Sequence, residues 1–94
     1  MNFEEYQKKV SEHPLYDDVI LGLVGEVGEV VELIKKDRRQ GTYRKILTKD
    51  RLEEELGDVM WYLSRVCTVH NINLNELVEN NIKKLNERHG IEKK

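Results

Sequence analysis

Apolar residues recur at helical spacing along most of this 94-residue chain. A short first segment, Phe3 to about Glu12, follows a capping Asn2 and ends at His13-Pro14, because the residue before a proline is disfavoured in helical geometry. The stretch from Tyr16 to Arg39 carries apolar residues at i, i+3, i+4 and i+7, which predicts a long amphipathic helix. Its main apolar positions are Ile20, Leu23, Val24, Val27, Val31 and Ile34.

The second half of the chain predicts two more helices. Asp50, with Glu53 three residues later, resembles a capping box that opens a helix running to about His70. Asn73 and Glu76 repeat this pattern before the last helix.

The remaining segments are interpreted as connectors. Arg38 to Arg51 is rich in basic side chains and has little strand-like alternation, so we expect a basic loop there. The last helix should end near Gly90, and the tail Ile91 to Lys94 should fray. Because no linker or repeat divides the sequence, we expect one all-α domain over residues 1–94.

Two carboxylate pairs lie at helical spacing, one on each long helix: Glu26/Glu29 in E-V-G-E and Glu55/Asp58 in E-L-G-D. Residues three apart on a helix point roughly the same way, so each pair offers oxygen ligands to one side. On a helical wheel of about 100° per residue, Glu26 interrupts a second apolar stripe formed by Val19, Val30 and Leu33. Glu55 lies in the arc of Val59, Tyr62, Val66 and Val69. The first long helix should therefore have apolar neighbours on two sides.

Two interpretations of these pairs compete. Glutamate is a strong helix former, and such pairs are usually the solvated edge of an amphipathic helix. Four carboxylates that face one another would instead repel, and a hard divalent cation relieves that repulsion. No cluster of His or Cys accompanies them, which favours Mg²⁺ or Mn²⁺ over zinc. Close helix approach or room for a ligand would explain the adjacent glycines Gly22, Gly25, Gly28 and Gly57.

Composition narrows the range of partners. The formal net charge is -2 and the sequence pI about 5.9, so nothing favours a nucleic acid or an anionic membrane as partner. Cys67 is the only cysteine, so it forms no intramolecular disulfide, and we interpret it as a packed thiol. No window approaches the roughly 20 apolar residues of a membrane span. We expect a cytoplasmic protein.

Three motifs resemble the MazG-type nucleoside triphosphate pyrophosphohydrolases of the all-α NTP pyrophosphatase superfamily: G-L-V-G-E-V-G-E-V-V-E-L-I-K-K, L-E-E-E-L-G-D-V-M-W-Y-L and N-I-K-K-L-N-E-R-H. The resemblance covers about residues 16–89. It implies a four-helix fold that forms a homodimer, often a homotetramer. It also implies hydrolysis of a (d)NTP to the monophosphate and pyrophosphate by water attack at the α-phosphorus, as in house-cleaning of nucleotide pools.

The resemblance also implies roles for particular residues. The implied ligands of Mg²⁺, or of Mn²⁺ as a substitute, are Glu26, Glu29, Glu55 and Asp58. Lys84 and Arg88 match the family's basic residues and would bind the substrate phosphates, with Asn81 close to the substrate.

The chain departs from the family at Gly25, where many relatives carry a second Glu. The identity of the catalytic base therefore stays open. Glu54 and Glu32 are candidates, and both project farther toward the polar side of their helices. Trp61 is a candidate neighbour of the substrate, although helical aromatic residues more often pack in a core or at a dimer contact.

Other functions stay open on the sequence alone. A non-catalytic helical oligomerisation or regulatory protein would use the carboxylates only for solubility and subunit pairing. A nucleic-acid binder acting through residues 38–51 is disfavoured by the acidic balance of the chain. For an enzyme, the candidate substrates include modified dNTPs, NTPs in general, dCTP and dUTP.

Overall fold

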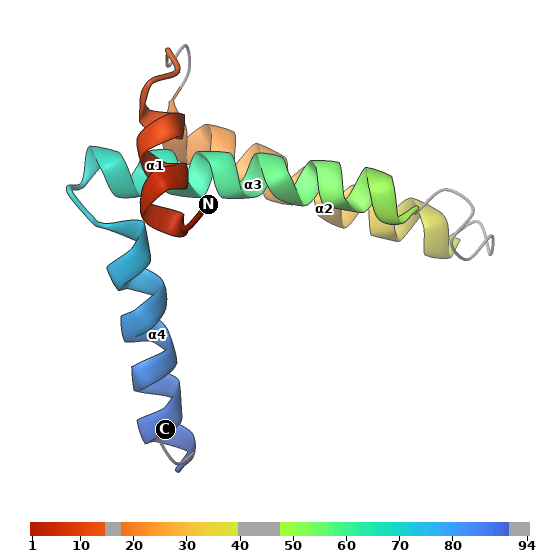
Figure 1. The fold of residues 1–94 in the computed structure, drawn as a ribbon. Helices are drawn as coiled ribbons and strands as arrows, with labels where there is room; N and C mark the ends of the chain where they lie inside the picture. The colour runs from red at the N-terminus through yellow and green to blue at the C-terminus, as the bar shows by residue number, and fades with distance from the viewer. Residues whose placement is uncertain (15–17, 40–47, 91–94) are drawn as a thin grey trace.

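The computed structural model describes residues 1–14, 18–39 and 48–90, which form four α-helices without a strand. The helices are α1 (Phe3–Ser11), α2 (Val19–Arg39), α3 (Lys49–Val69) and α4 (Leu74–His89) (Figure 1). The predicted all-α class is confirmed. Most of the expected basic loop and the expected frayed tail lie outside the described residues. Among the helices described, none is long and apolar enough to cross a membrane.

α2 and α3 form the body of the molecule. They lie side by side and antiparallel, α1 crosses the C-terminal half of α3, and α4 runs away from the pair (Figure 1). The radius of gyration is 16.2 Å, whereas a compact domain of 94 residues has about 12 Å. The accessible surface of 7392 Å² also exceeds the about 5,700 Å² expected for a compact 11.1 kDa monomer. The single chain is therefore open.

Short polar side chains cap α1 and α3. The Asn2 side chain accepts the Glu5 backbone N–H at 2.8 Å, which confirms the predicted cap of α1. The Thr48 hydroxyl accepts the Arg51 N–H at 3.2 Å, and α3 begins at Lys49. The predicted Asp50 cap is therefore wrong. Asp50 lies in the first turn, because Thr48 already has the extended backbone that a capping residue needs.

Polar side chains also cap the N-terminal ends of α2 and α4, and a glycine ends α4. The Asp18 carboxylate accepts two backbone N–H groups at the start of α2, at 2.8 and 3.1 Å, so α2 begins at Val19. This start is later than the predicted Tyr16, which lies outside the described residues. Asn73 caps α4 as predicted, and Gly90 ends it in the left-handed conformation, with φ of 67°.

α1 ties α3 to α4 through polar contacts. The buried Arg65 guanidinium of α3 donates to one backbone carbonyl in the last turn of α1, at 2.9 Å, and to one in the segment just after α1, at 2.8 Å. The Gln7 side chain of α1 donates to the Ile72 carbonyl at 2.8 Å and accepts the Leu74 N–H at 2.9 Å. Because both groups belong to the segment between α3 and the first turn of α4, Gln7 holds the turn that directs α4.

α2 has two apolar stripes, and the described part of the chain covers only one of them. Val19 and Leu33, on the stripe that carries Glu26, are 8% and 6% exposed. Much of the main apolar stripe is open to solvent. Its open members, between 43% and 65% exposed, are Ile20, Val24, Val27 and Val31. The sequence predicted apolar neighbours on both sides of this helix. Among the helices that the structure describes, α3 alone packs along α2, because α4 runs away from it.

Candidate metal centre

Three glutamates from two helices converge between α2 and α3. Glu26 and Glu29 of α2 and Glu55 of α3 each place a carboxylate oxygen within 4.8 Å of the other two. Glu26 and Glu55 are half-buried, and each has a buried Oε2 without a hydrogen-bond partner among the described residues. A buried carboxylate oxygen without a donor is costly, and coordination of a hard cation relieves that cost. The donor set therefore fits Mg²⁺ or Mn²⁺.

Two of the three glutamates, Glu26 and Glu55, have raised pKa values. Burial is the largest cause that raises the pKa of Glu26, followed by the charges of its carboxylate neighbours Glu29, Asp58 and Glu55. The pKa of Glu55 is raised first by a hydrogen bond with Glu29, then by burial and by the charge of Glu29. A divalent cation opposes both shifts, because it stabilises the ionised carboxylates that bind it.

Asp58, the fourth predicted ligand, lies at the edge of the cluster. Its side chain is exposed, and it does not belong to the group of three within 4.8 Å. Its charge nevertheless raises the pKa of both Glu26 and Glu55. The pKa of Tyr6, on α1, is also raised, first by burial and then by Asp58. The structure thus places Asp58 near the three glutamates, but at longer range.

The glycines beside the carboxylates have two different environments. A Cβ atom at Gly22 would overlap the Tyr62 ring of α3, so this glycine permits the close contact of α2 with α3. At Gly25, Gly28 and Gly57 a Cβ would meet no atom of residues 1–14, 18–39 or 48–90 within 4 Å. Close helix approach therefore explains Gly22, whereas the other three leave open space beside the helices.

A groove of about 280 Å³ opens beside the glutamate cluster. Its lining residues are Glu29, Glu32, Leu33, Lys36, Arg51 and Glu55. Two of them belong to the cluster, and Glu32 is one of the two candidate bases. The other candidate, Glu54, is exposed and does not line the groove, although its charge raises the pKa of Glu55.

Lys36 and Arg51 also line the groove. The sequence predicted Arg51 as the last residue of a basic loop and no separate role for Lys36, whereas Arg51 lies in the first turn of α3. Their signal lies in the helical register, since Lys36 follows Glu29 by seven residues and Arg51 precedes Glu55 by four. Both spacings place the two members of a pair on one face of a helix. These spacings indicate a shared groove only because α2 and α3 pack against each other.

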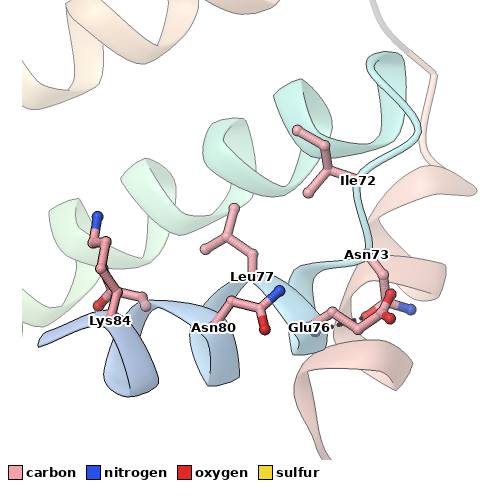
Figure 2. A pocket seen from close by; sticks show the side chains of 7 residues that line it. Ile72, Asn73, Glu76, Leu77, Asn80 and Lys84 are labelled. Carbon is pink, nitrogen blue, oxygen red and sulfur yellow. Dashed lines mark hydrogen bonds between the residues drawn. The ribbon is translucent and has the colours of Figure 1, made fainter. Parts of the chain in front are cut away.

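The predicted phosphate-binding residues of α4 lie elsewhere in the chain. Asn81 and Lys84 line a separate groove along α4, and Figure 2 shows Lys84 extending from α4 with Ile72 and Asn73 at the turn before it. Arg88 is exposed, one turn beyond Lys84. Because α4 runs away from α2 and α3, one chain does not bring Lys84 and Arg88 to the glutamate cluster (Figure 1).

Trp61 of α3 packs against neighbours on the same helix and against His13, which follows α1. Its ring centroid lies 5.0 Å from that of Tyr62 and 6.3 Å from that of His13, both in edge-on geometry. The Arg65 guanidinium lies 5.2 Å from the same centroid. These contacts account for the half-buried indole, and a role of Trp61 near the substrate stays a prediction.

Cys67, also on α3, is 2% exposed. Burial raises the pKa of its thiol. This agrees with the packed thiol that the sequence predicts.

Comparison with known proteins identifies the family. The profile of the MazG nucleotide pyrophosphohydrolase domain matches residues 16–90. The chain therefore belongs to the MazG nucleotide pyrophosphohydrolase domain family. It is also similar to the Gene 37 protein of Mycobacterium phage L5, with 37% identity over 73 residues that cover 74% of this chain. The matched part spans 62% of that relative's length. No solved structure matches the chain.

Proposed function

We propose that this chain is a Mg²⁺-dependent nucleoside triphosphate pyrophosphohydrolase, which converts a (d)NTP into the (d)NMP and pyrophosphate by water attack at the α-phosphorus. The convergence of Glu26, Glu29 and Glu55 within 4.8 Å, inside the segment that matches the family, carries this proposal. House-cleaning of nucleotide pools and a cytoplasmic location belong to the same proposal.

In this proposal Glu26, Glu29, Glu55 and Asp58 hold the Mg²⁺, with Mn²⁺ as a substitute. The bound cation supplies charge neutralisation for the phosphate oxygens and a lower pKa for the attacking water. The chain presents the carboxylates from two packed helices, which fixes their relative positions. Glu26 and Glu55 are half-buried, and partial removal of these carboxylates from water strengthens their electrostatic interaction with a bound cation.

We favour Glu32 over Glu54 as the residue that accepts a proton from the attacking water. Glu32 lines the same groove as Glu29 and Glu55, whereas Glu54 does not. A general base must come within hydrogen-bond reach of the proton that it removes, so a position in the groove is the first requirement.

We further propose that the functional unit is a homodimer or a homotetramer. The accessible surface exceeds that of a compact monomer by about 1,700 Å², and a standard interface buries about 800 Å² of each partner. The open stripe of α2, which includes Val24 and Val27, is the surface that a second copy covers in this arrangement. Asn81, Lys84 and Arg88 would then act on substrate bound to the other subunit.

The enzymatic proposal is tested with a panel of natural and damaged (d)NTPs and Mg²⁺ in ¹⁸O-labelled water. We expect monophosphate and pyrophosphate as products, with the label in the monophosphate, and no turnover in excess chelator. Diphosphate and phosphate as products, or label in the pyrophosphate, would contradict attack at the α-phosphorus.

The open stripe of α2 also favours a second candidate, a non-catalytic oligomerisation or regulatory protein. Such a protein would self-associate through Val24 and Val27 without releasing pyrophosphate from any nucleotide of the panel. Product release therefore separates the two candidates, whereas oligomeric state does not.

A further inference from the structure

Two cations lie in the groove beside the proposed metal centre. Lys36 comes from α2 and Arg51 from α3, and both line the same 280 Å³ space as Glu29 and Glu55. Both side chains are exposed, so their charged ends have access to a ligand that enters from solvent. The groove therefore combines metal-binding oxygens with groups that bind anions.

The helical register places both cations on the same side of the metal centre. With a rise of about 1.5 Å per residue, Lys36 lies about 10 Å along α2 from Glu29, and Arg51 about 6 Å along α3 from Glu55. α2 and α3 are antiparallel, so both displacements run toward the C-terminal end of α2 and the N-terminal end of α3, which lie at the same end of the pair (Figure 1). A chain of phosphates that starts at the metal and extends in this direction meets both side chains.

We propose that Lys36 and Arg51 bind the β- and γ-phosphates of the substrate and hold the pyrophosphate leaving group. This inference rests on the proposed pyrophosphohydrolase function. Arg51 presents several N–H donors in a planar fork that suits phosphate oxygens, and Lys36 adds a compact positive charge.

Binding of the leaving group by Lys36 and Arg51 suits the chemistry of the proposed hydrolysis. The water oxygen forms a bond to the α-phosphorus, and one water proton passes through the base to solvent. The bond between the α-phosphorus and the α,β-bridging oxygen breaks, and its electron pair stays on that oxygen, which leaves as part of pyrophosphate. Negative charge therefore develops on the leaving group, on the side where Lys36 and Arg51 lie, and cations placed there stabilise it.

The cations of α4 do not replace this pair within one chain. Lys84 lines a different groove, on the helix that runs away from α2 and α3 (Figures 1 and 2). If Lys84 and Arg88 act from a second subunit, Lys36 and Arg51 still contact the phosphates from the subunit that holds the metal. Mutations of the α4 cations and mutations of the groove cations should therefore have distinguishable effects.

The experiment uses inorganic pyrophosphate with Mg²⁺ as the probe and compares wild type with Lys36→Gln and Arg51→Gln. Lys49→Gln is the matched control, because Lys49 is an exposed cation in the first turn of α3 that does not line the groove. Calorimetry measures the Kd for pyrophosphate, and steady-state kinetics measure KM and product inhibition. We expect each groove variant to weaken pyrophosphate binding and raise KM about tenfold, while Lys49→Gln stays at the wild-type values.

A separate titration distinguishes phosphate binding from a general effect on the acidic cluster. Mn²⁺ affinity, measured without nucleotide, should not weaken in either groove variant, since both changes remove positive charge. If active wild type and both variants share the same pyrophosphate Kd and KM, the inference is overturned while the proposed function stands. If wild type hydrolyses no (d)NTP at all, the proposed function fails first.

Discussion

The two sides of α2 differ in what covers them. On one side Val19 and Leu33 are nearly buried, and Glu26 lies half-buried among them. On the other side Val24 is 65% and Val27 43% exposed, although this stripe is the more regular apolar pattern in the sequence. The most regular stripe is thus not the one that builds the fold of the single chain.

The two sides of α2 should therefore contribute to different properties of the protein. The covered side meets α3 and brings carboxylates from both helices together, so it positions the proposed metal centre. The open side contributes little to the single chain, and exposed apolar patches of this kind mark interfaces. Changes on the covered side should therefore act on chemistry or folding, and changes on the open side on assembly.

The largest effect should follow from removing charge on the covered side. Glu29→Gln, Glu55→Gln and Asp58→Asn should each lower turnover by about 10²–10³-fold, because each removes the charge of a proposed metal ligand while the size of the side chain is kept. Circular dichroism should show unchanged helix content. Glu53→Gln is the matched control, since Glu53 is an exposed glutamate of α3 outside the cluster. Wild-type turnover in all three variants would overturn the assignment of the site.

A smaller effect should follow from a charge on the open side. Val27→Glu should weaken self-association by about 100-fold, because it would place an unpaired carboxylate within an apolar interface. Analytical ultracentrifugation over a range of concentrations measures the change. Val69→Glu serves as the control, because Val69 is also exposed, at 57%, but lies at the end of α3. An unchanged dissociation constant for Val27→Glu would exclude this stripe as the interface.

The covered side should also produce a pH dependence in the apo protein. The pKa values of Glu26 and Glu55 are raised above the ordinary value of 4.5, so the folded state retains protons that the unfolded state has released. The stability that these retained protons contribute is present at low pH and is lost as the pH rises through the raised pKa values. Thermal melts in chelator should therefore show this decline, and Glu26→Gln should reduce it.

Saturating Mg²⁺ provides the comparison for these melts. A bound cation stabilises the ionised carboxylates, so the melting temperature should then rise where the apo protein is losing stability. A pH dependence that is identical with and without Mg²⁺ would contradict cation binding by these glutamates.

Local features of the fold were predictable from the sequence, because they depend on neighbouring residues. Helical periodicity gave the four helices, and Asn2, Asn73 and Gly90 mark helix ends as expected. The error at α3 is of the same local kind, since Thr48 and Asp50 are both good capping residues two positions apart, and the earlier one is used.

Features that depend on distant contacts were not predictable in the same way. The direction of α4 depends on Gln7, which bonds to groups more than sixty residues away. The carboxylate pairs were visible because their spacing lies within single helices. The groove position of Lys36 and Arg51 required knowing that α2 and α3 pack side by side.

The smallest effects should come from glycines on the two sides of α2. Gly22→Ala should destabilise the protein by about 1–3 kcal/mol, because the new methyl group would displace the Tyr62 ring on α3. Gly28→Ala should stabilise it by up to about 1 kcal/mol, because its Cβ meets open space and alanine favours the helix. Urea titrations of both variants measure these changes. Destabilisation by Gly28→Ala together with weaker self-association would mean that the second copy approaches α2 closely at Gly28, which would extend the proposed interface beyond Val24 and Val27.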